Sequence, residues 1–445
     1  MGQGEKGRPQ VTAPPSGEPV RAEQPARRRR VAANAFWAIC DQIVSSGTNF
    51  VLAFLVAHSV GASAFGAFSV AFAIFALAIG FARASITSPL GIRFSGDDAP
   101  RRNTATSGAA GASLLLGLAL APVLVGGALI LGGRLLAPLV TLGLVLPGLF
   151  VQDAWRYHFF AAGRAKAAVL NDAAWGVLEL LFVSLALATG ATTAVPFLLA
   201  WGVAGAGAAA LGARQSDLFP RPRTALRWLA ENRGLTKYLL AEYVTIGGAQ
   251  QVSYLVLGVF SGIATVGSFR GAQVILAPAT VVVTGLFTFA LPELSRRNGL
   301  PPEKLYLWGV GLTGVAVAMC TIWGSLWLLA PDSVGTALLG ATWPGTHSIL
   351  LPSVVSLAGT AATVGPATVI YSLGRPRLTL PVNVVLAISV IVGSLCGLQM
   401  GGPRGAAWGY AIAYWGTFPL WLLQTRVAVR AGAAARGLLT ARTTQ

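Results

Sequence analysis

Charged side chains are scarce in this sequence. Only 11% of its 445 residues are Asp, Glu, Lys or Arg, whereas a soluble protein usually carries about 25%. Hydrophobic residues make up 54%, and the mean hydropathy is +0.67. Several apolar runs are long enough to cross a bilayer, since about 20 such residues span its hydrocarbon core. The composition excludes an ordinary soluble domain and predicts an all-α polytopic membrane protein.

Cysteine and histidine are also few, and the short signatures of enzymes are missing. The three cysteines fall inside apolar runs and the three histidines are scattered, which favours core packing over a disulfide or a metal cluster. No glycine-rich loop ends in Gly-Lys-Ser/Thr, and no HExxH is present. We therefore expect a protein that is not an enzyme and that holds no cofactor or metal.

The apolar runs and the basic connections between them predict twelve transmembrane helices. With the N-terminus in the cytoplasm, all but three of the 32 Lys and Arg residues fall on the cytoplasmic side, the exceptions being Arg134, Arg270 and Arg404. This asymmetry follows the positive-inside rule and predicts that both termini are cytoplasmic. The predicted helices cover roughly residues 34–57, 65–86, 107–131, 135–160, 166–188, 194–212, 238–262, 268–291, 305–329, 348–373, 379–399 and 405–424.

A longer basic connection divides the helices into two sets of six. In this connection Arg223, Arg227 and Trp228 predict a short amphipathic helix on the inner leaflet. The net charge of +17 lies between apolar segments, so it indicates contact with membrane lipids rather than with nucleic acid. The expected parts are a disordered basic tail at 1–32, a six-helix lobe at 33–213, a linker at 214–237, a second six-helix lobe at 238–424 and a basic tail at 425–445.

The two sets of helices show an internal repeat with an offset of 201 residues. The pattern GxxxxGxF occurs at 61–68 and again at 262–269, and Asp41 falls on Glu242. Because each set contains an even number of helices, both enter from the same side, and the repeat is parallel. Secondary transporters use this symmetry and place their substrate between the repeats near the midplane.

Polar side chains follow one face of the first helix of each half. On a helical wheel those of the first helix share an arc of about 160°, which would not face lipid, because a charge in hydrocarbon costs several kcal/mol. We expect the two helices to line a central cavity, and the alternative is hydrogen bonding that only packs the bundle. The predicted lining residues are Asp41, Gln42, Ser45 and Asn49 in the first half and Glu242, Gln250 and Ser253 in the second.

Two arginines near the membrane are candidates for binding phosphate, because the guanidinium group matches phosphate oxygens in geometry. Arg270 begins the eighth helix at its external end, and its counterpart in the first half is Ser69. Arg156 lies near the inner end of the fourth helix, close in sequence to Asp153 and Asp172. The alternatives are that Arg270 snorkels to the surface and that Arg156 forms an interfacial ion pair with one of these two acids.

Four stretches together resemble the polysaccharide-exporter branch of the multidrug/oligosaccharidyl-lipid/polysaccharide (MOP) flippase superfamily. They are DQIVSSGTNFVLAFLVAHSVGASAFGAFSVA at 41–71, QDAWRYHFFAAGRAKAAVLNDAAW at 152–175, GSFRGAQVILAP at 267–278 with FALPELSRR at 289–297, and LLGATWPGTHSILLP at 338–352. The resemblance covers most of 34–424. It implies a bacterial plasma-membrane protein with two six-helix lobes in a V and a cavity that opens alternately to each side. It also implies cavity arginines that bind diphosphate, a role open here to Arg270, Arg156 or Arg83.

Three functions follow from these patterns. The first is a flippase that moves a lipid-linked oligosaccharide or polysaccharide precursor, carried on polyprenyl diphosphate, from the inner to the outer leaflet. The second is a multidrug antiporter in which Asp41 and Glu242 bind Na⁺ or H⁺. The third is a non-transporting component of a glycan-synthesis complex, which the duplicated polar helices disfavour because a scaffold needs no polar cavity.

Overall fold

The computed structural model describes residues 23–95, 97–296 and 301–443. Every regular element in these ranges is a helix, as the sequence predicts. Residues 1–22, most of the predicted disordered tail, lie outside the described ranges. Helix α1 already begins at Glu23, so the arginine-rich end of that predicted tail continues the first helix.

The helices form two lobes joined by a linker. The N-terminal lobe contains α1 (Glu23–Ser59), α2 (Ala62–Ala82), η1 (Arg83–Thr87), α3 (Ser88–Phe94), α4 (Ala99–Leu131), η2 (Gly133–Leu135), α5 (Leu136–Ala161), α6 (Ala165–Ala188) and α7 (Ala194–Ser216). The linker contains η3 (Pro222–Thr224), α8 (Ala225–Tyr243) and η4 (Val244–Gly248). The C-terminal lobe contains α9 (Ala249–Ser261), α10 (Ile263–Arg296), α11 (Pro302–Leu329), α12 (Asp332–Leu339), η5 (Gly340–Thr342), α13 (Trp343–Ala362), α14 (Val364–Ser372), η6 (Pro376–Leu378) and α15 (Thr379–Thr443).

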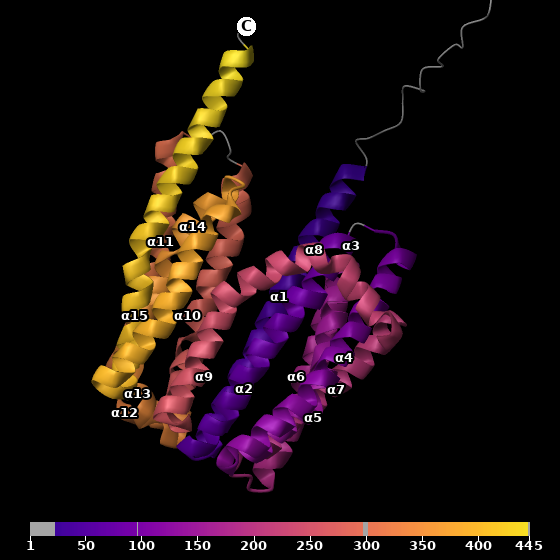
Figure 1. Ribbon diagram of the computed structural model, residues 1–445, viewed down its shortest axis with the longest axis vertical. Helices are drawn as coiled ribbons and strands as arrows, with labels where there is room; N and C mark the ends of the chain where they lie inside the picture. The colour runs from indigo at the N-terminus through magenta and orange to yellow at the C-terminus, as the bar shows by residue number, and fades with distance from the viewer. Residues whose placement is uncertain (1–22, 96, 297–300, 444–445) are drawn as a thin grey trace, which may run out of the picture.

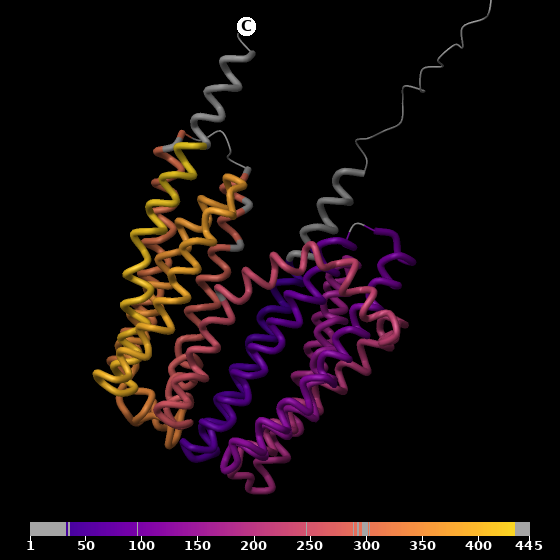
Figure 2. Tube along the Cα trace, viewed as in Figure 1, coloured from indigo at the N-terminus to yellow at the C-terminus, as the bar shows by residue number. Residues whose placement is uncertain are grey.

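The two lobes form a V (Figure 1). They lie apart at the end of the molecule where α1 begins and α15 ends, which we call the open end. They meet at the opposite end, which we call the joined end and where α1 turns into α2 and α9 turns into α10. The traces converge toward the joined end in the same way (Figure 2). Helix α2 of the N-terminal lobe packs against α10 and α9 of the C-terminal lobe, and α1 reaches α12.

Ten helical segments in the described ranges are long and apolar enough to cross a membrane. The twelve predicted spans differ from these ten in two places. Helix α15 contains two predicted spans, because Gly401 and Gly402 leave helical geometry and the chain turns back there. The predicted span at 238–262 consists of the end of α8, the π-helix η4 and the short helix α9. The predicted basic tail after residue 425 is helical as far as Thr443.

Helix α8 lies across the open end and is docked on the N-terminal lobe (Figure 1). Trp228, predicted to belong to a helix on the inner leaflet, is instead buried and packs against Phe94 with ring centroids 5.4 Å apart. Arg93 donates hydrogen bonds of 3.0 Å to the carbonyl oxygen of Glu231 and to Oδ1 of Asn232. Apolar packing and these two bonds therefore fix the linker to one lobe.

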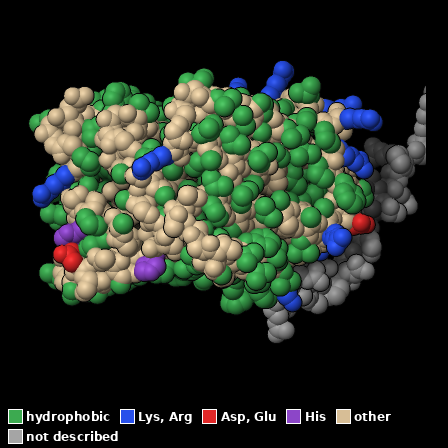
Figure 3. All heavy atoms as spheres, turned by 90° about the horizontal axis from the view of Figure 1, so that it is seen from below, with side chains coloured by type: hydrophobic (Ala, Val, Ile, Leu, Met, Phe, Trp, Pro, Cys, Tyr) green, Lys and Arg blue, Asp and Glu red, His purple; other side chains and the backbone are tan. Residues whose placement is uncertain are grey.

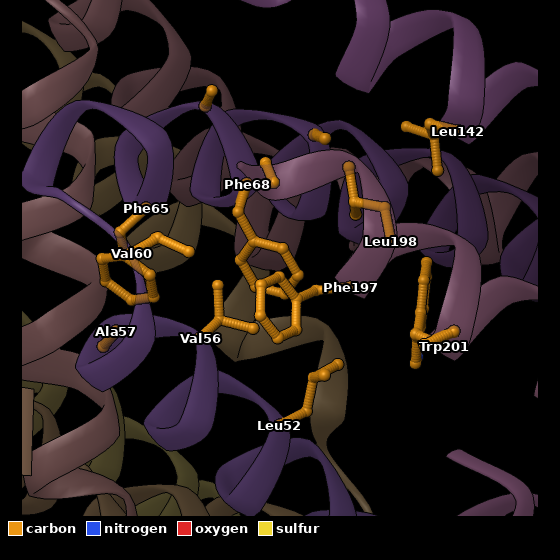
Figure 4. Packing of buried hydrophobic residues seen from close by; sticks show 14 of the residues in the cluster. Leu52, Val56, Ala57, Val60, Phe65, Phe68, Leu142, Phe197, Leu198 and Trp201 are labelled. Carbon is orange, nitrogen blue, oxygen red and sulfur yellow. The ribbon is translucent and has the colours of Figure 1, made fainter. Parts of the chain in front are cut away.

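The core of the N-terminal lobe is built from large side chains of α1, α2, α5 and α7 (Figure 4). Phe68 on α2 is fully buried and stacks between Phe65 and Phe72, with centroids 6.2 and 6.1 Å away. Phe197 and Trp201 of α7 complete the cluster. The same cluster continues into the C-terminal lobe through Ile275, Leu339 and Trp343, so densely packed side chains also join the two lobes.

Phe68→Ala is expected to destabilise the protein by about 3–5 kcal/mol, since removal of a fully buried ring leaves a cavity. Denaturant unfolding in detergent micelles would measure the loss. Ile130→Ala is the control, because that side chain is 87% exposed at the end of α4 and should change stability little. Equal effects of the two substitutions would contradict this description of the core.

Candidate functional site

Two arginines and three aspartates of the membrane helices form ion pairs in the open half of the N-terminal lobe. Arg156 of α5 lies between two carboxylates, Asp41 of α1 and Asp172 of α6. Its Nε donates to Asp41 Oδ2 at 2.9 Å, and its Nη2 contacts the same oxygen. Its Nε also lies 3.4 Å from Asp172 Oδ2. Both acids are buried, and the arginine side chain is 15% exposed.

A second ion pair lies beside the first. Arg83 opens the π-helix η1, and its Nε and Nη2 lie 2.8 and 2.7 Å from Asp153 Oδ1. Thr87, four residues later in η1, donates to Asp153 Oδ2 at 3.1 Å. Asp153 is thereby occupied on both oxygens and buried, while the Arg83 side chain is 41% exposed. The acid holds the arginine in place, and the guanidinium group keeps N–H donors on its exposed side.

Neutral polar groups support these ion pairs from behind. Gln152 Nε2 donates to Asp172 Oδ1 at 2.8 Å and to Asn171 Oδ1 at 3.2 Å. Asn171 Nδ2 donates in turn to the carbonyl oxygen of Ala208 at 2.9 Å and to Gln215 Oε1 at 3.1 Å. Such partners orient a buried carboxylate and offset part of the cost of removing it from water.

The two arginines line a cavity of about 630 Å³ at the open end. Its wall comes from α1, η1, α3, α5 and α8, and it includes apolar side chains such as Ile92, Phe160 and Leu239. Polar and apolar surfaces therefore alternate within one space that is large enough for a drug-sized ligand or the head of a lipid-linked sugar. Asp41 and Gln42, predicted to line a cavity, do so together with Arg156.

Arg270 lies elsewhere, at the junction of the two lobes. Its guanidinium carbon is 4.2 Å from the ring centre of Phe72 on the opposite lobe, and Nη1 donates to Gln273 at 3.2 Å. Its Nε is buried without a hydrogen-bond partner. Within the described ranges no carboxylate pairs with it. A small cavity of about 40 Å³ adjoins it, lined also by Ser69, Gln251 and Tyr254. Arg270 is half-buried, and its guanidinium group lies against the opposite lobe.

The other predicted residues are not brought together with these groups. In α1 the side chain of Asn49 donates to the backbone carbonyl oxygen of Ser45 at 2.7 Å, so this amide bonds to its own helix, and neither Asn49 nor Ser45 lines the two cavities. Glu242 is exposed at the end of α8 and lines neither cavity. Gln250 donates to the Tyr254 hydroxyl at 3.2 Å.

The polar group inside the C-terminal lobe is uncharged. Buried Ser253 lies 2.9 Å from Ser394 Oγ and accepts a 2.7 Å hydrogen bond from the Tyr410 hydroxyl. Tyr410 also packs against Tyr254 and Phe269. In the part of the chain that is described, no group of three or more His, Cys, Asp or Glu side chains could hold a metal ion.

The sequence predicts an ion pair of Arg156 with either Asp153 or Asp172. Arg156 pairs with Asp172, one of the two predicted partners, and with Asp41, while Asp153 pairs with Arg83. Gln152, Thr87 and Tyr410 were not singled out. A polar residue inside a long apolar run was the available signal for Gln152 and Tyr410, whereas Thr87 is too ordinary a membrane residue to notice.

Arg156→Gln should destabilise the fold by about 3–5 kcal/mol, because it leaves two buried carboxylates without a counterion. Asp41→Asn should cost less, since Arg156 keeps Asp172. Thermal unfolding in detergent micelles would rank the variants by their loss of stability. Arg101→Gln, which breaks an exposed pair with Asp97, is the control and should have little effect. Equal stability of the Arg156 and Arg101 variants would refute a structural role for the buried cluster.

No protein-family model and no curated protein matches this sequence. Solved structures do match it. An inward-facing conformation of a multidrug resistance MATE family transporter of the MOP superfamily superimposes with a TM-score of 0.71 and 15% identity, covering 89% of this chain and 99% of that one. The lipid II flippase MurJ in an inward closed conformation gives 0.70 and 11%, covering 87% of each chain. An outward-facing MATE conformation gives 0.61 and 16%, covering 91% and 96%. At these identities the likeness establishes the fold, which is that of MATE transporters and of the MurJ flippase.

Proposed function

We propose that this protein is an alternating-access flippase that moves a lipid-linked oligosaccharide or polysaccharide precursor across a bacterial plasma membrane. The observation that carries the proposal is the unpaired Arg270 between the lobes. A desolvated cation without a counterion costs several kcal/mol, and such a group is retained where it meets an anion. The diphosphate of a polyprenyl-linked sugar is a suitable anion, since guanidinium and phosphate form strong charge-assisted hydrogen bonds.

The open-end cavity suits the same kind of substrate. Arg83 exposes its guanidinium group there, while Ile92, Phe160 and Leu239 add apolar wall. We infer that a substrate head group enters beside Arg83 and advances toward Arg270 at the base of the V. The two arginines thus offer successive positive charges to one diphosphate. The flippase MurJ, a neighbour in fold, supports transport of this class.

We propose that the open end faces the cytoplasm. Two independent observations support this orientation. The distribution of Lys and Arg favours a cytoplasmic position for both termini. The conformation, with its termini at the open end, also superimposes better on an inward-facing transporter than on an outward-facing one, with TM-scores of 0.71 and 0.61. The substrate would therefore be loaded from the inner leaflet.

A cation-coupled multidrug antiporter is the second candidate, and the charge balance of the N-terminal lobe favours it. Three carboxylates, those of Asp41, Asp153 and Asp172, face only two guanidinium groups there. Asp41 Oδ1 is buried and has no hydrogen-bond partner. A proton or Na⁺ on this oxygen would supply the missing positive charge. The MATE transporters among the structural neighbours are described as multidrug transporters.

Arg270→Gln should lower the apparent affinity for a polyprenyl-diphosphate oligosaccharide about 10–100-fold, because a charge-assisted hydrogen bond contributes about 1.5–3 kcal/mol. Reconstituted vesicles with a fluorescent lipid-linked sugar would report flipping as protection from an impermeant quencher. Arg134→Gln, an exposed arginine at the joined end, is the control with the same loss of charge. Unchanged flipping by a folded Arg270→Gln protein would exclude the diphosphate role.

Asp41→Asn distinguishes the second candidate. If a cation binds at Asp41, the variant should lose the dependence of transport on a proton or sodium gradient, because the amide cannot take up the charge. Transport would be measured with each gradient imposed separately. Asp98→Asn is the matched control, since Asp98 is exposed between α3 and α4. An identical gradient response of the Asp41 variant and the wild type would reject coupling through this carboxylate.

A further inference from the structure

The repeated GxxxxGxF pattern places its second glycines against each other across the lobe interface. Gly66 of α2 and Gly267 of α10 occupy equivalent positions in the two copies. A Cβ atom built on Gly267 would lie 3.2 Å from Cα and N of Gly66. A Cβ atom on Gly66 would overlap the carbonyl oxygen of Ile263 and lie 2.7 Å from its carbonyl carbon. The two backbones are therefore in direct contact near the local symmetry axis.

This contact lies at the joined end, where both helices begin. The face of the molecule at this end is mostly apolar or uncharged (Figure 3). Farther along the same interface, Arg270 stacks on Phe72. A second backbone approach at the joined end joins Gly340 to His58, but Gly340 has a φ of +51° and would be strained by any side chain. At Gly66 and Gly267 the backbone conformation suits other residues. A substitution there therefore probes the contact between the lobes without straining its own backbone.

The linker is fixed to one lobe and reaches the other through a single irregular segment. Helix α8 is fixed to the N-terminal lobe by Trp228, by Arg93 and by Thr236, which donates to the carbonyl oxygen of Ser85 at 3.1 Å. The only irregular segment between α8 and the C-terminal lobe is the π-helix η4, which ends in Gly247 and Gly248. A π-helical turn with adjacent glycines is a weak point at which a helix bends.

We propose that Gly66 and Gly267 form the closing contact of a gate at the joined end, with η4 as the bend that lets the lobes part there. A Cβ atom on Gly66 would force the backbones apart, and one on Gly267 would be in tight contact with the opposite backbone, so glycine on both sides gives the closest approach. A rigid rotation that opens the joined end separates the pair and brings the open ends together. The duplicated pattern is then a gate built from one glycine of each repeat. The inference rests on the proposed function only in requiring alternating access.

Gly66→Ala tests the gate through two interlobe distances. Spin labels at exposed Thr192 and Ser333 report on the joined end, and labels at exposed Asp98 and Arg377 report on the open end. The native cysteines would be replaced by alanine, and electron–electron dipolar spectroscopy would be run in lipid nanodiscs. Gly66→Ala should raise the ratio of long to short Thr192–Ser333 distances about tenfold, and the Asp98–Arg377 distances should shorten.

Gly61→Ala is the matched control in the same pattern. Its added Cβ meets nothing within 4 Å, and its φ of −64° suits alanine. Gly267→Val is a second variant for the case in which Gly66→Ala does not fold. The proposal would be overturned if a folded Gly66→Ala or Gly267→Val protein showed the same interlobe label distances as the wild type. It would also be overturned if Gly61→Ala shifted these distances as much as Gly66→Ala does. The measurement needs no substrate, so its failure is distinct from a failure of Arg270 to bind diphosphate.

Discussion

Hydrocarbon offers no hydrogen-bond partner and little stabilisation for charge, and this constraint organises the molecule. A buried arginine or carboxylate must find its counterion and its donors inside the protein. In the N-terminal lobe Arg156 lies between Asp41 and Asp172, and Gln152 donates a hydrogen bond to Asp172 from behind. Arg83 meets the same demand through Asp153, and its guanidinium group still reaches the cavity.

Arg270 does not follow that rule within the described ranges. It is stabilised by the face of Phe72 and by Gln273, neither of which carries charge. A cation over an aromatic ring is worth a few kcal/mol at most, and the flippase proposal assigns this residue an anionic partner. The contrast between two paired arginines and one unpaired arginine is the physical basis for the flippase proposal.

The duplicated halves have diverged in chemistry while keeping the contact between them. Equivalent positions carry Ser69 and Arg270, or Asp41 and Glu242, and the two acids occupy different surroundings. The C-terminal lobe has a serine–tyrosine cluster around Ser253 in place of ion pairs. The second glycines of both copies lie where the two backbones meet, and a Cβ atom on Gly66 would overlap the carbonyl oxygen of Ile263.

The sequence by itself determined the helical class, nearly all of the spans and the duplication, because apolar runs and a fixed offset are local or repetitive signals. It also marked Asp41, Arg156 and Asp172 as unusual in a membrane. Only the tertiary structure decided which charges pair, since Arg156 and Asp41 lie 115 residues apart and pairing depends on helix packing. The helical wheel of α1 could not show that the Asn49 side chain donates to the backbone of Ser45. That Arg83 lines the same cavity as Asp41 depends on the packing of the helices around that cavity. The docking of Trp228 on the N-terminal lobe was decided in the same way, because an amphipathic helix binds lipid or protein by one and the same apolar face.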